Sequence, residues 1–289
     1  CEYIYQRTEG YIAKIDRLFR TLLEQGALIQ TENGWKFEEP KVEITLKDLS
    51  QLTKGEKQIL DIISIASIDV PASILKECFS LTDFYENIFG LLKKGFLIER
   101  TFRGESIYSV SDTEIRDKLI TETELDTYML LAKAIQRSGN TDPTWKAIRI
   151  EALSKNEHNT DWIVEADQAL EDFRLTKSIE PTKSVATILA NHYKKINDLK
   201  NAYKFYVHAG LMCYKLDQFD EAVDFHNKSL SIAKSANKEL LISNVLNDFG
   251  TTFMKAGDSA KALEYFKESV TIAQKINNTV EMRGAWFFQ

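Results

Sequence analysis

The sequence predicts a mainly α-helical protein that begins with two helix–hairpin segments and ends in an array of helical repeats. Three observations support this fold class. Apolar residues recur at helical spacing through most of the chain. Only four prolines occur in 289 residues. In the last third of the chain, small residues return at an offset of 40 positions.

The first segment, residues 1–40, predicts a helix followed by a β-hairpin. Residues 11–25 place their apolar side chains on one helical face, and Gly26 then stands where a helix needs a left-handed closing residue. An apolar run at 27–29, a turn at 33–34 and a second strand from Trp35 to Phe37 complete the expected hairpin.

The same order of residues returns about 70 positions later, at the end of a domain that we place at 41–124. Thr53 and Glu56 have the spacing of a capping box and begin a helix over 53–67. A second helix follows Pro71, and a third runs from Thr82 to a closing glycine, Gly95. A hairpin with its turn at 103–104 follows, so three helices and a two-stranded wing predict a winged helix-turn-helix.

From Asp112 onward the pattern is helical almost throughout. We expect one helix over about 114–139 and two more helical segments over 144–180, and we place a helical connector at 125–182.

Residues 183–289 carry a repeat. Aligning Gly210 with Gly250 also aligns Ala222 with Ala262, and small residues at these places let paired helices approach closely. This pattern is similar to that of tetratricopeptide repeats, so we expect an α-solenoid of that type. The last unit departs from the pattern at Gln274, where a proline is usual, and the 40-residue period exceeds the usual one. An irregular helical bundle is the alternative.

Composition excludes several classes of protein. A net charge of −6 argues against a chain built mainly for nucleic acid or anionic membranes. The cysteines Cys1, Cys78 and Cys213 form no closely spaced pair, which indicates a reducing compartment and no structural zinc. No apolar run is long enough to cross a bilayer. We therefore expect a cytoplasmic protein that does not bind membranes.

No catalytic, cofactor-binding or metal-binding constellation is visible in the sequence. It contains no phosphate-binding loop, because TKGEK at 53–57 has one glycine and begins a helix. His192 and His208 could meet across neighbouring helices, but single histidines on helix faces are the commoner case. We expect no enzyme activity, no cofactor and no metal in this segment.

The winged helix raises the question of DNA binding. Its third helix reads TDFYENIFGLLKKG, with Asp83 and Glu86 at the end that would face phosphates. We therefore expect no nucleic-acid partner, and a transcription regulator remains an alternative.

The chain resembles the region that follows the nucleotide-binding domain in signal-transduction ATPases with numerous domains. RLFRTLLEQGALIQTENGWKF is similar to the end of the family's ATPase lid. LTKGEKQILDIISIAS, LLKKGFL and IYSVSDTEIRDKLI resemble the domain that follows, and ILANHYKKINDLKNAYKFYVHAG resembles the entry into its repeats. The family's histidine near the strand end is absent from residues 109–112, and residues 140–182 match poorly.

The resemblance implies a non-catalytic regulatory and protein-interaction module that couples partner sensing to a nucleotide switch. It also implies a contact with a nucleotide-binding domain that would precede Cys1. An accessory region of a cyclase or protein kinase is a further alternative. We expect the chain to be a piece of a longer protein, because it lacks an initial Met and ends in AWFFQ. Trp286, Phe287 and Phe288 would then begin another repeat and could promote self-association.

Function should reside on the concave surface of the solenoid, which the first helix of each repeat lines. Polar residues between the core positions are the candidates for binding a protein or peptide partner: Asn191, Lys194, Asn244, Asn247, Asp248 and Thr251.

Overall fold

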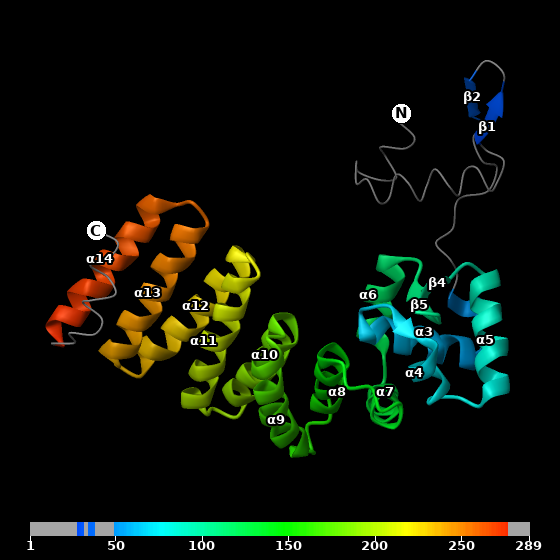
Figure 1. Cartoon of the computed structure of the whole chain (residues 1–289), viewed down its shortest axis with the longest axis horizontal. Coiled ribbons are helices and arrows are strands. Elements are labelled where there is room, and N and C mark those ends of the chain that lie inside the picture. Colours follow the sequence, from blue (N-terminus) through cyan, green and yellow to red (C-terminus); the bar gives the residue numbers. More distant parts are fainter. Residues whose placement is uncertain (1–27, 32–33, 38–48, 277–289) are drawn as a thin grey trace. The chain divides into compact units, whose positions relative to one another are not determined.

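The computed structural model describes residues 28–31, 34–37 and 49–276, in two units, Cys1–Leu52 and Thr53–Gln289 (Figure 1). In the first unit, β1 (Leu28–Thr31) and β2 (Gly34–Phe37) form an antiparallel hairpin, and η1 (Leu49–Gln51) is a single 3₁₀ turn. The register pairs Thr31 with Gly34, so Gly34 begins β2 and does not belong to the turn in which we expected it. The helix predicted over 11–25 and its cap Gly26 lie outside the described residues.

The second unit begins with the predicted order of three helices and a hairpin. The strand order β3–β5–β4 is antiparallel throughout, with Val70 opposite Tyr108 and Phe102 opposite Glu105. The three helices and the hairpin thus follow in the order that the sequence predicted. We refer to residues 53–110 as the winged-helix region, after the fold that the sequence led us to expect. Its elements are α3 (Lys54–Ala66), β3 (Val70–Pro71), α4 (Ala72–Lys76), α5 (Leu81–Lys93), β4 (Leu97–Phe102) and β5 (Glu105–Val110).

The N-terminus of α3 is fixed by the predicted capping box. The Thr53 hydroxyl accepts from the Glu56 backbone N–H at 3.2 Å, and the Glu56 carboxylate accepts from the Thr53 N–H at 2.7 Å. The same buried carboxylate pairs with Lys94 at 2.6 Å. Gly90 makes room for it, because a Cβ there would lie 2.2 Å from a Glu56 oxygen. The capping box therefore also ties α3 to the end of α5.

The C-terminus of α5 is closed by a left-handed glycine, as predicted. Gly95 has a φ of 72°, and its N–H donates to the Leu92 carbonyl at 3.0 Å. The Phe96 N–H donates to the Leu91 carbonyl at 2.9 Å, which completes the motif. The wing then turns at Arg103 and Gly104, whose φ values of 50° and 81° are those of a tight hairpin turn.

The single helix expected over about 114–139 is two helices, α6 (Thr113–Glu122) and α7 (Leu125–Arg137). Thr123 is extended, with ψ at 130°, and its hydroxyl donates to the Leu119 carbonyl at 2.7 Å. A β-branched residue whose hydroxyl binds a carbonyl of the last helical turn favours a helix end at that position. The prediction of a single helix over 114–139 was therefore wrong.

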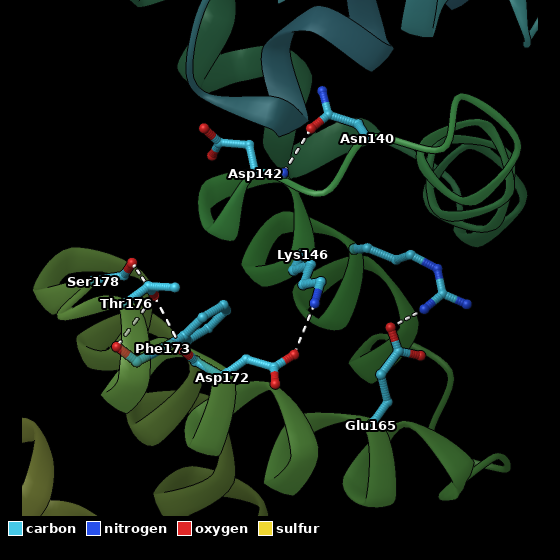
Figure 2. Close-up of polar contacts among 9 residues, drawn as sticks. Asn140, Asp142, Lys146, Glu165, Asp172, Phe173, Thr176 and Ser178 are labelled. Atoms are coloured by element: carbon cyan, nitrogen blue, oxygen red, sulfur yellow. Dashed lines mark hydrogen bonds and ion pairs between the residues drawn. The ribbon is translucent and has the colours of Figure 1, made fainter.

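Within the connector, α7 is followed by α8 (Pro143–Ser154) and α9 (Asp161–Thr176), which pack against each other. Ile150, Trp162 and Ala166 are buried in the core that these two helices share. Polar contacts lie at the edge of this pair: Lys146 contacts the Asp172 carboxylate (Figure 2), at a distance of 2.8 Å. Arg149 also pairs with Glu165. Asn140 and Asp142 order the turn that begins α8 (Figure 2).

The remaining helices form a regular array in which each begins 20 residues after the one before and each is 17 residues long. The middle residue of each three-residue linker has a left-handed backbone, and these residues recur at the same interval: Asn197, Asp217, Asn237 and Gly257. Asn, Asp and Gly adopt this conformation most readily. Their recurrence every 20 residues explains why the helices are joined by similar tight turns. The helices are α10 (Ile179–Lys195), α11 (Leu199–Lys215), α12 (Phe219–Ser235), α13 (Glu239–Lys255) and α14 (Ser259–Lys275). The boundary that we expected at residue 183 falls inside α10.

Candidate functional site

Two glycines set how closely the helices of a pair approach. A Cβ on Gly210 of α11 would lie 2.9 Å from the imidazole of His226 on α12. A Cβ on Gly250 of α13 would lie 2.5 Å from the ring of Phe266 on α14. These contacts are related by 40 residues, so α11–α12 and α13–α14 are equivalent helix pairs. The small-residue pattern of the sequence therefore marks real close contacts.

Polar contacts show which helices lie side by side across neighbouring pairs. The Tyr203 hydroxyl on α11 donates to the Leu241 carbonyl on α13 at 3.4 Å, and Lys255 of α13 donates to the Tyr214 carbonyl of α11 at 2.9 Å. On the other side, Lys183 of α10 donates to Gln218 at the start of α12 at 2.9 Å. The array therefore has two layers, with α11 beside α13 in one and α10 beside α12 in the other.

Stacked aromatic rings fill the space between α13 and α14. The rings of Phe249 and Tyr265 are 4.7 Å apart and nearly parallel, and Tyr265 also stacks on Phe253 at 5.4 Å. Fully buried Phe249 in addition meets His226 edge-on at 5.2 Å. These aromatic contacts hold α13 against α14 and α12.

His226 is the one described histidine that lies fully inside the array, at 2% exposure. Its Nε2 lies 3.0 Å from the Thr252 hydroxyl on α13, and its buried Nδ1, which faces Gly210, has no hydrogen-bond partner among the described residues. Burial lowers the pKa of His226 to about 4, so the ring is neutral at pH 7. It takes the place that Phe266 has in the next pair and is a core residue.

Four of the predicted partner-binding residues lie on α13 along one side of the helix. Asn244, Asn247, Asp248 and Thr251 are all half-buried, and the Thr251 hydroxyl donates to the Asn247 carbonyl at 2.9 Å. Leu240, one turn earlier on the same side, is 44% exposed.

We did not predict the equivalent positions on α11 from the sequence. The 40-residue repeat identifies them, because each lies 40 positions before a residue of the α13 set. Leu211 is 44% exposed, and Lys204 is exposed with its ammonium 4.9 Å from the Phe205 ring centroid. Burial, together with Lys215 and Lys204, lowers the pKa of half-buried His208, which is therefore neutral at pH 7. We define the α11–α13 surface by nine residues: Lys204, Val207, His208, Leu211, Leu240, Asn244, Asn247, Asp248 and Thr251.

Asn191 and Lys194 lie elsewhere, on α10 in the other layer. Asn191 is exposed and accepts a hydrogen bond from the Tyr206 hydroxyl at 2.9 Å. It lines a hollow of about 370 Å³ between the end of α10 and residues 154–162, in which Trp162 meets His192 edge-on at 5.1 Å. Lys194 is exposed. The six predicted residues thus fall on two separate faces, because we assigned α10 to the same layer as α13.

The α11–α13 surface combines hydrogen-bonding side chains with exposed apolar ones. Asn244 and Asn247 each carry a carboxamide, which both donates and accepts hydrogen bonds as a peptide group does. Leu211 and Leu240 add apolar area at either end. Within the described ranges, no group of three or more His, Cys, Asp or Glu side chains could hold a metal ion. No helix in that same part of the chain is both long and apolar enough to span a bilayer.

Comparison with known proteins identifies the repeat array. Residues 188–275 match the family model of the tetratricopeptide repeat, which covers the second half of α10 and all of α11–α14. This region is therefore a tetratricopeptide array, as the sequence predicted, and such arrays are protein-interaction modules. No match was found among the curated proteins.

Two solved structures are similar to the chain at low identity. One is a signal transduction ATPase with numerous domains that has a tetratricopeptide repeat sensor, from Pyrococcus horikoshii; it is 14% identical, and the match covers 99% of this chain and 52% of that one, with a TM-score of 0.33. The other is BtubC from P. vanneervenii, 16% identical over 78% of this chain and 93% of that one, with a TM-score of 0.38. The chain spans about half the length of the Pyrococcus protein.

Proposed function

We propose that this chain is a non-catalytic interaction module whose α11–α13 surface binds a peptide segment of a protein partner. The observation that carries the proposal is the direct contact of α11 and α13 in one layer of a tetratricopeptide array, which aligns their half-buried polar residues. Stacked repeats recognise extended protein segments along such a continuous face.

The side chains of the α11–α13 surface indicate the chemistry of the ligand. Carboxamides at Asn244 and Asn247 match the donors and acceptors of a peptide backbone. Exposed Leu211 and Leu240 favour apolar side chains in the bound segment. Lys204 and Asp248 carry opposite charges, so the surface favours neither a strongly acidic nor a strongly basic ligand.

The module would be regulatory, as the family resemblance of the sequence implies. It would be cytoplasmic, because the cysteine spacing indicates a reducing compartment and no apolar run is long enough to cross a bilayer. In a longer protein, partner binding to the array would change a contact with a nucleotide-binding domain and so restrain or release an ATPase. The direct test is to measure ATP hydrolysis by such a longer protein with and without a peptide that binds the array. Unchanged hydrolysis at saturating peptide would argue against the coupling and would leave the binding itself intact.

The binding can be tested without a known partner. A phage-displayed library of random peptides is selected against the whole 289-residue chain, and the dissociation constant of one selected peptide is measured by fluorescence anisotropy. We expect Asn247→Ala and Leu211→Asp each to weaken binding about tenfold or more. The first removes a carboxamide from the middle of the surface, and the second replaces an apolar contact at its end with a charge.

The matched control is Asn227→Ala, which removes an exposed carboxamide from α12, in the other layer. It should leave the affinity unchanged. Selected peptides whose affinity falls with Asn227→Ala but not with the two surface variants would refute the proposal.

A further inference from the structure

The α5 helix of the winged-helix region has two apolar sides. Phe84, Ile88 and Leu91 are buried in the domain core. Leu81, Tyr85 and Phe89 follow each other at intervals of four residues along the other side and are 63%, 56% and 69% exposed. A contiguous apolar stripe of this kind on a folded domain marks an interaction surface.

The surroundings of the stripe do not favour a nucleic acid. A cleft of about 610 Å³ between α5 and the wing is lined by Tyr85 and Phe89 on one side and by Glu99 and Glu105 on the other. The Lys76 ammonium lies 5.3 Å from the Tyr85 ring centroid. A helix that reads DNA exposes Arg, Lys, Asn or Gln at these positions, and a carboxylate-lined cleft repels phosphate.

Charges are ordered along the edge of the stripe. Glu86 and Lys93 are seven residues apart, border Tyr85 and Phe89 on the same side, and are both exposed. Neither side chain has an ion-pair partner in the part of the chain that the structure describes. The edge is thus acidic toward the start of α5 and basic toward its end.

This order of charges is self-complementary in one orientation. Two α5 helices can run antiparallel about a two-fold axis near Phe89. Each residue then faces a residue of the other helix, and the numbers of the two facing residues add up to about 178. Tyr85 then faces Leu92 of the other helix, and Phe89 faces its own counterpart. Glu86 faces Lys93, twice over, because the interface is symmetric.

We propose that a second copy of this chain covers the stripe, through antiparallel pairing of two α5 helices held in register by Glu86 and Lys93. A few side chains from each copy bury less than the roughly 1,200 Å² of total surface typical of stable complexes, so the dimer is weak, with a dissociation constant on the order of micromolar. This pairing is independent of the α11–α13 surface.

The test is sedimentation velocity of the whole chain from about 1 µM to about 200 µM, a range that spans a micromolar constant. We expect the unmodified chain to shift from monomer to dimer over this range. Glu86→Lys and Lys93→Glu should each remain monomeric, because like charges then face each other twice.

An equimolar mixture of these two variants should dimerise again, since both pairs become attractive in the heterodimer. Glu268→Lys, an equally exposed charge reversal on α14, is the control and should dimerise like the unmodified chain. A chain that stays monomeric throughout, single variants that dimerise normally, or a mixture that fails to recover would each overturn the proposal. If the chain dimerised through another surface, the single variants would dimerise normally, so this alternative would also overturn the proposal.

Discussion

His226 should make the repeat array less stable in mild acid, and replacing it with phenylalanine should remove this effect. The ring is buried, its Nδ1 has no hydrogen-bond partner among the described residues, and its pKa is lowered from 6.5 to about 4. The unfolded chain therefore binds a proton near pH 6.5, whereas the folded chain does so only near pH 4. Stability is complete above pH 6.5 and falls as the pH drops from 6.5 to 4.

The size of the effect follows from the two pKa values. Each unit of pKa difference corresponds to about 1.4 kcal/mol, so the full loss by pH 4 is about 3 kcal/mol. Between pH 8 and pH 5 the loss is about 2 kcal/mol, because one and a half units of this range lie below the pKa of the unfolded state.

His226→Phe is a suitable substitution because the equivalent position in the next helix pair, residue 266, is already phenylalanine. Phe266 packs against Gly250 as His226 packs against Gly210, with comparable or closer approach. The variant loses one hydrogen bond to Thr252, about 1 kcal/mol, and gains apolar contact, so its stability at pH 8 should lie close to that of the unmodified chain.

The assay is urea unfolding of both chains at pH 8 and pH 5, followed by far-ultraviolet circular dichroism. Comparison with the variant is needed because other groups titrate in the same range; burial, for example, raises the pKa of Asp61 to about 6. The unmodified chain should lose about 2 kcal/mol more than the variant between the two pH values. Equal losses, or a His226 resonance that titrates near pH 6.5 by NMR, would refute the reasoning.

Three further predictions concern the fold and the absence of nucleotide chemistry. Gly95→Ala should cost about 1 kcal/mol of unfolding free energy and Gly95→Val more, because φ is 72° there; a neutral valine variant in urea unfolding would contradict the assigned helix end. Gly250→Ala should cost about 1–3 kcal/mol, since the new Cβ would lie 2.5 Å from the Phe266 ring, and an unchanged midpoint of thermal unfolding would mean that the helices can separate freely. Purified chain should show no heat of ATP binding by calorimetry, because its sequence has no phosphate-binding loop; stoichiometric binding would disprove this.

Much of the fold could be predicted because its signals are local. The Thr53–Glu56 capping box and the Gly95 helix end depend on residues within five positions of each other, and both are confirmed. The 40-residue offset between Gly210 and Gly250 is likewise visible in the sequence, since close helix contact requires a residue without a side chain.

The features that sequence reasoning missed depend on tertiary structure. The break between α6 and α7 falls in the polar run 121–124, Thr-Glu-Thr-Glu, which contains no Gly or Pro to mark a helix end. The packing of α8 on α9 joins residues that are distant in sequence, such as buried Ile150 and Ala166 in the core and Lys146 and Asp172 at the edge, which 26 residues separate. Asn191 was grouped with the α13 residues because a 20-residue helix period makes successive helices look alike, although the contacts of Lys183 place α10 beside α12.

The central claim is that a protein segment binds across α11 and α13, and site-specific photocrosslinking tests it most directly. A photoreactive residue is introduced at position 247 on α13, or at position 227 on α12, and each chain is irradiated with a peptide selected from the library. We predict that the chain labelled at position 247 crosslinks to the peptide and that excess unlabelled peptide suppresses the product, whereas position 227 gives none. Efficient, competable crosslinking from position 227 with none from position 247 would contradict the account.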